Sequence, residues 1–160
     1  MPLLEIDTTV TISCPPSKGD EWKSFQFNFE GFDYICSDDP DVKPGEYILS
    51  PQFICKGHTW NLIICPKHSF DRHSTDVSIF LKNNTICGTE TLAIKYEIMI
   101  LDKFGCVKKK RWLNKMFNRP DHSIGWPGFI SRSFIQDASN NIFDSKGTLS
   151  VIVSIKDEPT

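Results

Sequence analysis

Residues 50–68 read SPQFICKGHTWNLIICPKH and contain the clearest fold signal in the chain. From residue 58 to residue 66 the residues alternate in a way that places Trp60, Leu62 and Ile64 on one side of an extended chain. The dipeptide Lys56-Gly57 is a turn signal between this run and the apolar run before it. The stretch therefore predicts two antiparallel strands joined by a tight turn.

The same stretch raises the question of a metal site, because Cys55, His58, Cys65 and His68 follow the pattern Cys-x2-His twice. In a hairpin Cys55 lies beside His58, whereas Cys65 lies about 23 Å further along the second strand at ~3.3 Å per residue. Zinc ligands lie only ~2.0–2.3 Å from the metal, so these four residues cannot converge on one ion. We expect no metal site and no cofactor, although a smaller set of Cys65, His68 and His73 stays open.

Alternation with a period of two recurs along most of the chain and predicts an all-β protein. The expected strands are residues 21–31, 46–55, 58–66, 76–83, 91–101, 104–113 and 147–156. Turn signals separate these runs, a pattern typical of an antiparallel β-sandwich of seven to eight strands. Residues 131–139, SRSFIQDAS, are the one stretch for which we expect a helical turn.

A length of 160 residues fits one domain that can bury a substantial core. We expect an N-terminal arm at residues 1–20, the domain itself at residues 21–156 and a tail at residues 157–160. Within the arm, the alternation of TTVTIS, residues 8–13, permits one edge strand. Residues 37–46 are dense in Pro, Gly and Asp and predict a loop.

Charge and composition disfavour several classes of function. A net charge of -2 gives no reason to expect binding to nucleic acid or to a membrane. Neither a signal peptide nor a membrane span is evident, which favours a cytoplasmic or nuclear location. The six cysteines are widely spaced and mostly within apolar runs, so we expect buried, reduced thiols. Common catalytic motifs are not found, and we expect no enzyme activity.

Two features of the sequence are not expected in an ordinary β-sandwich. The run KKKRW, residues 108–112, cannot have a buried strand face and predicts an edge strand or a protruding hairpin. A nuclear-import signal or an anion-binding patch remains an alternative for it. The segment HSIGWPGFISRSF, residues 122–134, is expected to be a loop whose Trp126 either plugs the end of the sandwich or anchors a partner.

Several stretches together resemble the MATH domain, the meprin and TRAF homology fold. The matching stretches are FQFNFEGF, YILSPQFICKGHTWNLIICPK, DVSIFLK, IKYEIMILDKFG, GWPGFISRSFI and GTLSVIVSIK. The resemblance covers about residues 21–156 and implies an eight-stranded sandwich that binds short extended peptides in a shallow groove. MATH domains serve as adaptors for ubiquitin ligases and for receptor signalling.

The resemblance also implies a set of peptide-binding residues. Phe80 and Tyr96 match strand positions that supply groove aromatics, and Phe117 matches a third such position. Other family branches have an Asp-Trp-Gly-Phe pattern where this chain has Ser123, Ile124, Gly125 and Trp126. The glycine and the final aromatic are kept, whereas the acid and the first aromatic are lost, so the peptide specificity of those branches does not carry over.

The sequence therefore predicts a noncatalytic module that recruits partners through short linear peptide motifs, with Phe80, Tyr96 and Trp126 as anchors. Oligomerisation, if it occurs, would use regions outside this chain, since no heptad run is present. Two alternatives from other classes stay open: a structural, self-assembling β-sandwich and a carbohydrate-binding module.

Overall fold

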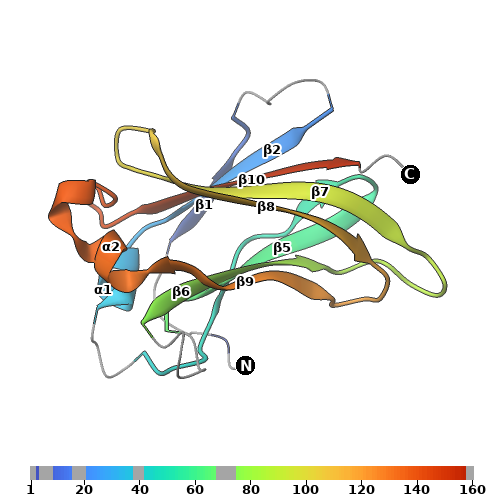
Figure 1. The fold of residues 1–160 in the computed structure, drawn as a ribbon, viewed down its shortest axis with the longest axis horizontal. Coiled ribbons are helices and arrows are strands. Elements are labelled where there is room, and N and C mark those ends of the chain that lie inside the picture. The colour runs from blue at the N-terminus through green and yellow to red at the C-terminus, as the bar shows by residue number, and fades with distance from the viewer. Residues whose placement is uncertain (1–2, 4–8, 16–20, 38–41, 68–74, 158–160) are drawn as a thin grey trace.

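Two antiparallel sheets stack face to face in the computed structural model, which describes residues 3, 9–15, 21–37, 42–67 and 75–157 (Figure 1). The first sheet has the order β1 (Val10–Ser13), β2 (Lys23–Phe29), β10 (Leu149–Asp157), β7 (Leu92–Leu101) and β8 (Val107–Phe117). The second has the order β3 (Ile48–Leu49), β5 (His58–Cys65), β6 (Asp76–Asn83) and β9 (Ser123–Ser131), and β4 (Phe53–Cys55) also pairs with β5. The prediction of an all-β antiparallel sandwich is confirmed.

The described residues form ten strands, where the sequence predicted seven or eight. The expected strand at residues 46–55 is divided into β3 and β4, and the expected loop at residues 122–134 contains β9. Strand β1 forms within residues 8–13, where the alternation permitted an edge strand, and it pairs with β2. The expected loop at residues 37–46 lies partly outside the described residues, which leave out 38–41.

Ser50 and Pro51 explain the break between β3 and β4. The buried Ser50 hydroxyl accepts a hydrogen bond from the Leu62 N–H at 2.8 Å and donates one to the Pro51 carbonyl at 3.0 Å. The side-chain oxygen thus takes a place that a backbone carbonyl would occupy in a continuous ladder. Pro51 has no N–H to continue that ladder, so pairing resumes only at Phe53.

The turn at Lys56-Gly57 forms as predicted. Lys56 and Gly57 have φ angles of 56° and 75°, and Cys55 and His58 are cross-strand partners. Positive φ at both central residues is typical of the turns that match the twist of a two-residue hairpin. Cys65 lies at the other end of β5, opposite Ser78 of β6.

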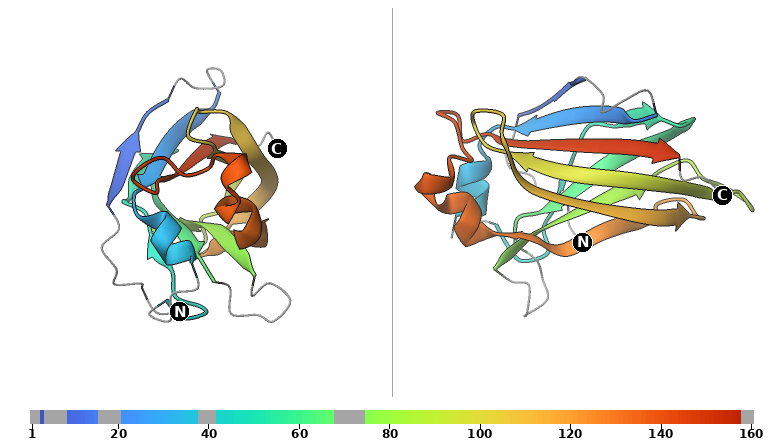
Figure 2. Two further views of the ribbon diagram at one scale, coloured as in Figure 1. Left: turned by 90° about the vertical axis from the view of Figure 1, so that its left-hand side faces the viewer. Right: turned by 45° about the horizontal axis from the view of Figure 1, so that its top comes forward.

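Three short helical elements lie together at one end of the sandwich (Figures 1 and 2). Two of them, α2 (Arg132–Gln136) and the 3-10 helix η2 (Ala138–Asn140), form within residues 131–139, where a helical turn was predicted. Ser131 caps α2, since its side chain accepts from the Phe134 N–H at 3.2 Å. The third, α1 (Phe32–Cys36), was not predicted. Among the described residues no helix has the length and apolar character needed to cross a membrane.

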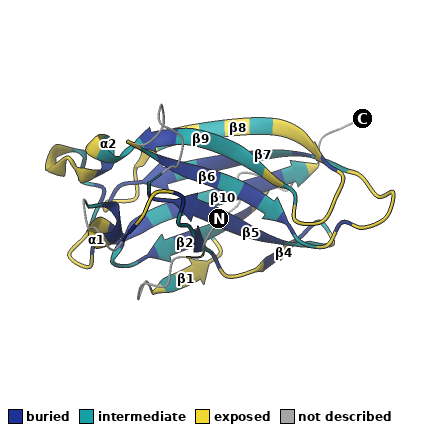
Figure 3. Cartoon of the chain, turned by 90° about the horizontal axis from the view of Figure 1, so that it is seen from below, coloured by how far each residue is buried: buried dark blue, intermediate teal, exposed yellow. Residues whose placement is uncertain are grey.

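The core is built from every second residue of the long strands. Trp60, Leu62 and Ile64 lie on one side of β5, as the alternation predicted; this side faces the first sheet, and all three are fully buried. The burial pattern alternates along β2 and β10 but is nearly continuous along β5 (Figure 3). The opposite face of β5 is therefore covered as well, which places Cys65 in packing, as expected.

Candidate functional site

Strand β9 is the terminal strand of the second sheet and carries three of the predicted site residues: Ser123, Gly125 and Trp126. The segment is a strand rather than the loop that its Gly and Pro content suggested. Pro127 is tolerated because an edge strand needs backbone hydrogen bonds on one side only. The register also shifts between Val77 and Ile79 of β6, which leaves Pro127 in an irregular part of the pairing, and there its carbonyl accepts from the Ser78 hydroxyl.

Phe80 and Trp126, two of the predicted anchors, do not share one surface. Trp126 pairs in register with the fully buried Ile79, so its side chain lies on the inner face of the second sheet. Phe80 pairs with Gly125 and lies on the opposite, outer face. Adjacent residues of a strand project to opposite sides, so the two aromatics lie on the two faces of one sheet.

Tyr96 and Phe117 lie under the surface, both with no exposed area. Both side chains therefore support the surface around β9 from beneath. The Tyr96 hydroxyl donates to the Ile124 carbonyl at 2.6 Å, and its ring meets that of Trp126 with centroids 5.6 Å apart. Burial raises the pKa of Tyr96, which keeps the phenol a neutral donor. This contact ties β7 of the first sheet to β9 of the second.

Phe117 completes the support under the edge strand. Its ring contacts Trp60 edge-on at 5.1 Å between centroids and lies 6.4 Å from Tyr96. Gly125 is required for the close approach of β9 to β6, because a Cβ at this position would lie 2.6 Å from the Phe80 Cα. The predicted residues thus share one region around β9, on the surface and beneath it.

Strands β8 and β9 are the edge strands that the two sheets present on the same side (Figures 2 and 3). A shallow cleft of about 320 Å³ lies between them. Its lining residues come from β8, β9 and α2: Lys108, Lys109, Arg111, Gly128, Phe129, Ile130, Ser131 and Phe134. The Arg111 guanidinium lies over the Phe129 ring at 5.9 Å from its centroid. This arrangement places positive charge beside the β9 edge, with the ring of the buried Phe129 beneath it.

The basic run at residues 108–112 occupies the edge strand that its charge predicted, because β8 ends the first sheet. The sequence did not indicate, however, that part of this run faces a cleft. Lys109, Arg111, Phe129 and Phe134 were therefore missed as candidate site residues. Alternation along residues 107–117 was a usable signal for the two cations, but the pairing of the two sheet edges was not visible in the sequence.

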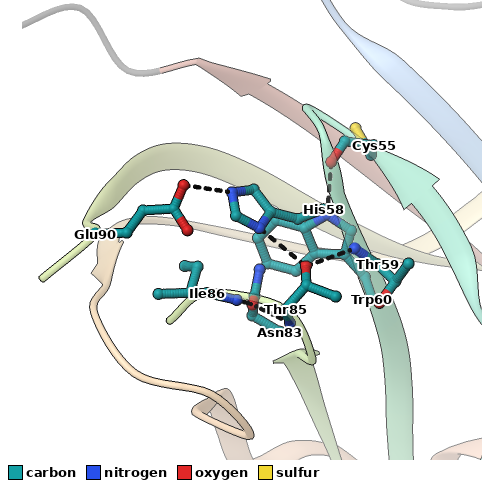
Figure 4. Close-up of polar contacts among 8 residues, drawn as sticks. All are labelled: Cys55, His58, Thr59, Trp60, Asn83, Thr85, Ile86 and Glu90. Carbon is teal, nitrogen blue, oxygen red and sulfur yellow. Dashed lines mark hydrogen bonds and ion pairs between the residues drawn. The ribbon is translucent and has the colours of Figure 1, made fainter. Parts of the chain in front are cut away.

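Cys55 and His58 of the opening stretch have structural partners (Figure 4). His58 Nδ1 lies 2.9 Å from the Thr85 hydroxyl, and its Nε2 lies 3.6 Å from a Glu90 carboxylate oxygen. The Trp60 indole N–H donates to the Cys55 carbonyl at 2.8 Å. The two His58 contacts connect the β4–β5 turn to the segment after β6, and the Trp60 hydrogen bond stabilises the hairpin itself. His68 and His73 lie outside the described residues, and among those described no cluster suits a metal ion.

The six cysteines are free, but only half match the expectation of burial. Cys36, Cys55 and Cys65 are buried. Burial raises the pKa of Cys55 and of Cys65 to about 11, so both thiols stay protonated near neutral pH. Cys14, Cys87 and Cys106 are exposed, because each lies outside or at the end of a strand, where the apolar run no longer reaches the core.

Comparisons with known proteins identify one family and one related fold. A family model described as "MATH domain" matches residues 24–153. Among 55 matching solved chains is one from Notothenia coriiceps TRAF5, with a TM-score of 0.67 and 14% sequence identity. The alignment covers 88% of this chain and 75% of that chain. A search of curated proteins found no match. At this identity the structural likeness concerns the fold alone.

Proposed function

Because this chain belongs to the MATH domain family, whose members mediate protein–protein interactions, we propose that it is a noncatalytic module that binds short extended peptides along β9. The observation that carries the proposal is the position of β9. It is the terminal strand of its sheet, beside the cleft that separates it from β8. An adaptor role follows, in which the bound peptide belongs to a substrate or a receptor that is being recruited.

Strand addition supplies the backbone part of the binding. Every second residue of an edge strand directs its N–H and C=O groups away from the neighbouring strand, which makes the edge a template for another chain. Between Ser123 and Trp126 the register with β6 is regular, so this part of β9 is straight enough to pair with a peptide. Pro127 cannot donate, and the added strand would therefore lose a hydrogen bond at that point.

The two aromatics on opposite faces suit an added strand, whose own side chains also alternate. One set of peptide side chains faces the cleft, whose lining residue Phe129 contacts the Trp126 ring. The other set lies over Gly125, which has no side chain to obstruct the path to the half-buried Phe80. Phe80, Gly125 and Trp126 thus act together across β9, although they do not share one surface.

Affinity is expected to be micromolar or weaker, because a short flexible peptide loses conformational entropy when it docks. Stronger binding would require several copies on one assembly, held together by regions outside this chain. We place the protein in the cytoplasm or nucleus, since its six free thiols suit a reducing compartment. Ubiquitin transfer and receptor signalling are both compatible with this role.

Selection from a random-peptide display library tests the proposal. The purified chain is compared with Phe80→Ala and with Phe104→Ala, which removes an equally large aromatic that is 70% exposed in the β7–β8 turn. We expect one short motif to be enriched, with about tenfold weaker binding to Phe80→Ala and unchanged binding to Phe104→Ala. Peptide-induced amide shifts in an NMR spectrum should concentrate at residues 123–131.

An enriched motif that binds both variants equally, or that shifts amides of β1 instead, would contradict the position of the site. If no motif is enriched, peptide binding itself fails. A mass that rises with concentration would then favour the self-assembling sandwich, and binding to a glycan array would favour the carbohydrate-binding module.

A further inference from the structure

Strand β8 is the most strongly charged element of the described structure. Residues 107–117, VKKKRWLNKMF, contain five Lys and Arg residues and no Asp or Glu, in a chain whose net charge is -2. A solvated edge strand can carry such charge simply to prevent aggregation. That explanation accounts for charges that point into water, but not for charges directed into a cleft.

A register shift turns part of this charge toward β9. Leu101 pairs with Val107 and Ile100 pairs with Lys109, so Lys108 is an extra residue opposite the β7 ladder. A bulge of this kind redirects a side chain, and both Lys108 and Lys109 line the cleft. Arg111 follows on the same face, whereas the exposed Lys110 belongs to the opposite face.

The cations of the cleft are not equally free to bind a ligand. Lys108 Nζ lies 3.9 Å from a carboxylate oxygen of Asp102. Arg111 lies over the Phe129 ring, a contact that favours a guanidinium position beside β9. The cleft lining contains three cations and no acidic residue among the described residues. Lys109 and Arg111 are therefore the groups best placed to meet negative charge.

We propose that the cleft between β8 and β9 selects acidic peptides, with Lys109 and Arg111 pairing with Asp or Glu side chains of the ligand. The inference rests on the proposed function, since it concerns the charge of a peptide added to β9. Arginine binds a carboxylate through two parallel hydrogen bonds, so Arg111 gives direction as well as charge. The complementarity is local and does not depend on the net charge of the chain.

The geometry of an added strand also specifies the spacing of the acidic residues in the peptide. Only every second side chain of a peptide on β9 faces the cleft, because successive side chains alternate between the two faces. The ligand should therefore carry acidic residues at alternate positions. The intervening residues lie on the outer face of the sheet, on the side of Phe80.

Lys109→Glu and Lys110→Glu form a matched pair of variants, because neighbouring lysines undergo the same change of charge on opposite faces of β8. A random-peptide display library is selected on the wild-type chain, on each single variant and on a Lys109→Glu, Arg111→Glu double variant. Circular dichroism and thermal unfolding establish that each variant is folded. Binding of the enriched peptide is then measured at low and at high salt.

We expect the wild-type chain to enrich peptides with acidic residues at alternate positions. Lys109→Glu should weaken their binding about fivefold, and Lys110→Glu by less than about twofold. A partly exposed ion pair contributes little free energy, but reversing the charge of Lys109 replaces an attraction by a repulsion and so roughly doubles the loss. Binding should also weaken with salt. The double variant should lose the preference for acidic residues.

Two results would overturn the inference. If a motif is enriched without acidic residues and binds Lys109→Glu as well as Lys110→Glu, peptide binding at β9 stands and the acidic preference fails. If no peptide is enriched on the wild-type chain, the proposed function fails, and the acidic preference fails with it.

Discussion

Ser50 shows how one hydroxyl shapes the most recognisable stretch of the sequence. Its oxygen accepts from the buried Leu62 N–H, and its own backbone carbonyl accepts from the Asn61 side chain at 2.6 Å. Pro51 then ends the local ladder. The pair Ser-Pro is therefore a structural device that joins β3 to β4, not a ligand site.

Ser50→Ala is expected to reduce the free energy of unfolding by about 1–3 kcal/mol, because it leaves a buried N–H without its acceptor. Denaturant unfolding measures the change. Ser145→Ala, at an exposed position, is the control and should shift stability by no more than about 0.5 kcal/mol. Equal effects of the two substitutions would contradict the role given to the Ser50 hydroxyl.

The thiols should divide into two classes under native conditions. At pH 8 a thiol reagent should modify the exposed Cys14, Cys87 and Cys106 rapidly. Cys55 and Cys65, with pKa values raised to about 11, have little thiolate at that pH and are shielded from the reagent. Peptide mapping by mass spectrometry identifies the modified residues. Modification of Cys55 as fast as Cys87 would show that the β4–β5 hairpin opens readily.

At the scale of elements, the spacing between β6 and β9 depends on one glycine. A Cβ on Gly125 would meet the backbone of Ile79 and Phe80, and backbone atoms cannot move aside as a flexible side chain can. Gly57 also lacks a side chain, but for another reason. It has φ of +75°, with nothing within 4 Å of the Cβ position.

Gly125→Ala should therefore cost about 1–3 kcal/mol of stability through steric overlap between strands. Gly57→Ala should cost about 1 kcal/mol through its left-handed backbone conformation. Hydrogen exchange distinguishes the two mechanisms. Only Gly125→Ala should accelerate exchange of the amides in β9. Faster exchange in β9 for both variants, or for neither, would contradict the close packing assigned to Gly125.

At the scale of the whole molecule, the edge formed by β1 is packed less tightly than the edges formed by β8 and β9. Strand β1 pairs only with β2 among the described residues, and its Ile12 is 43% exposed. The Tyr96 hydrogen bond and the aromatic cluster around Phe117 connect the sheets near β8 and β9 instead. The N-terminal strand is thus peripheral to the packing that positions the candidate site.

A chain that begins at Glu21 should still fold and unfold in one cooperative transition, because the core strands of both sheets remain. Loss of the half-buried Val10 and its pairing with β2 should cost about 2 kcal/mol. Calorimetry measures the transition, and the affinity for the enriched peptide should be unchanged. An unfolded product, or loss of peptide binding, would show that residues 1–20 belong to the domain itself.

Local pattern was sufficient for most of the fold. The alternation in residues 58–66 separates the two faces of β5, the Lys56-Gly57 turn predicts the hairpin, and the charge of residues 108–112 predicts an edge strand. Each of these features depends on neighbours within a few residues. Helix α1 and the division of residues 46–55 were missed, because both depend on contacts with distant segments, such as that between Ser50 and Leu62.

The candidate site depends on tertiary structure to a greater degree. The sequence could identify Phe80, Tyr96 and Trp126 as candidate site residues. It could not show that Tyr96 is buried or that Phe80 and Trp126 lie on opposite faces of their sheet. Those facts follow from the register between β6 and β9 and from the packing of the two sheets against each other. The direction of a side chain in a strand reverses with a shift of one residue. The pattern within one strand therefore specifies its two faces. Only pairing across strands specifies which face meets the core and which meets a partner.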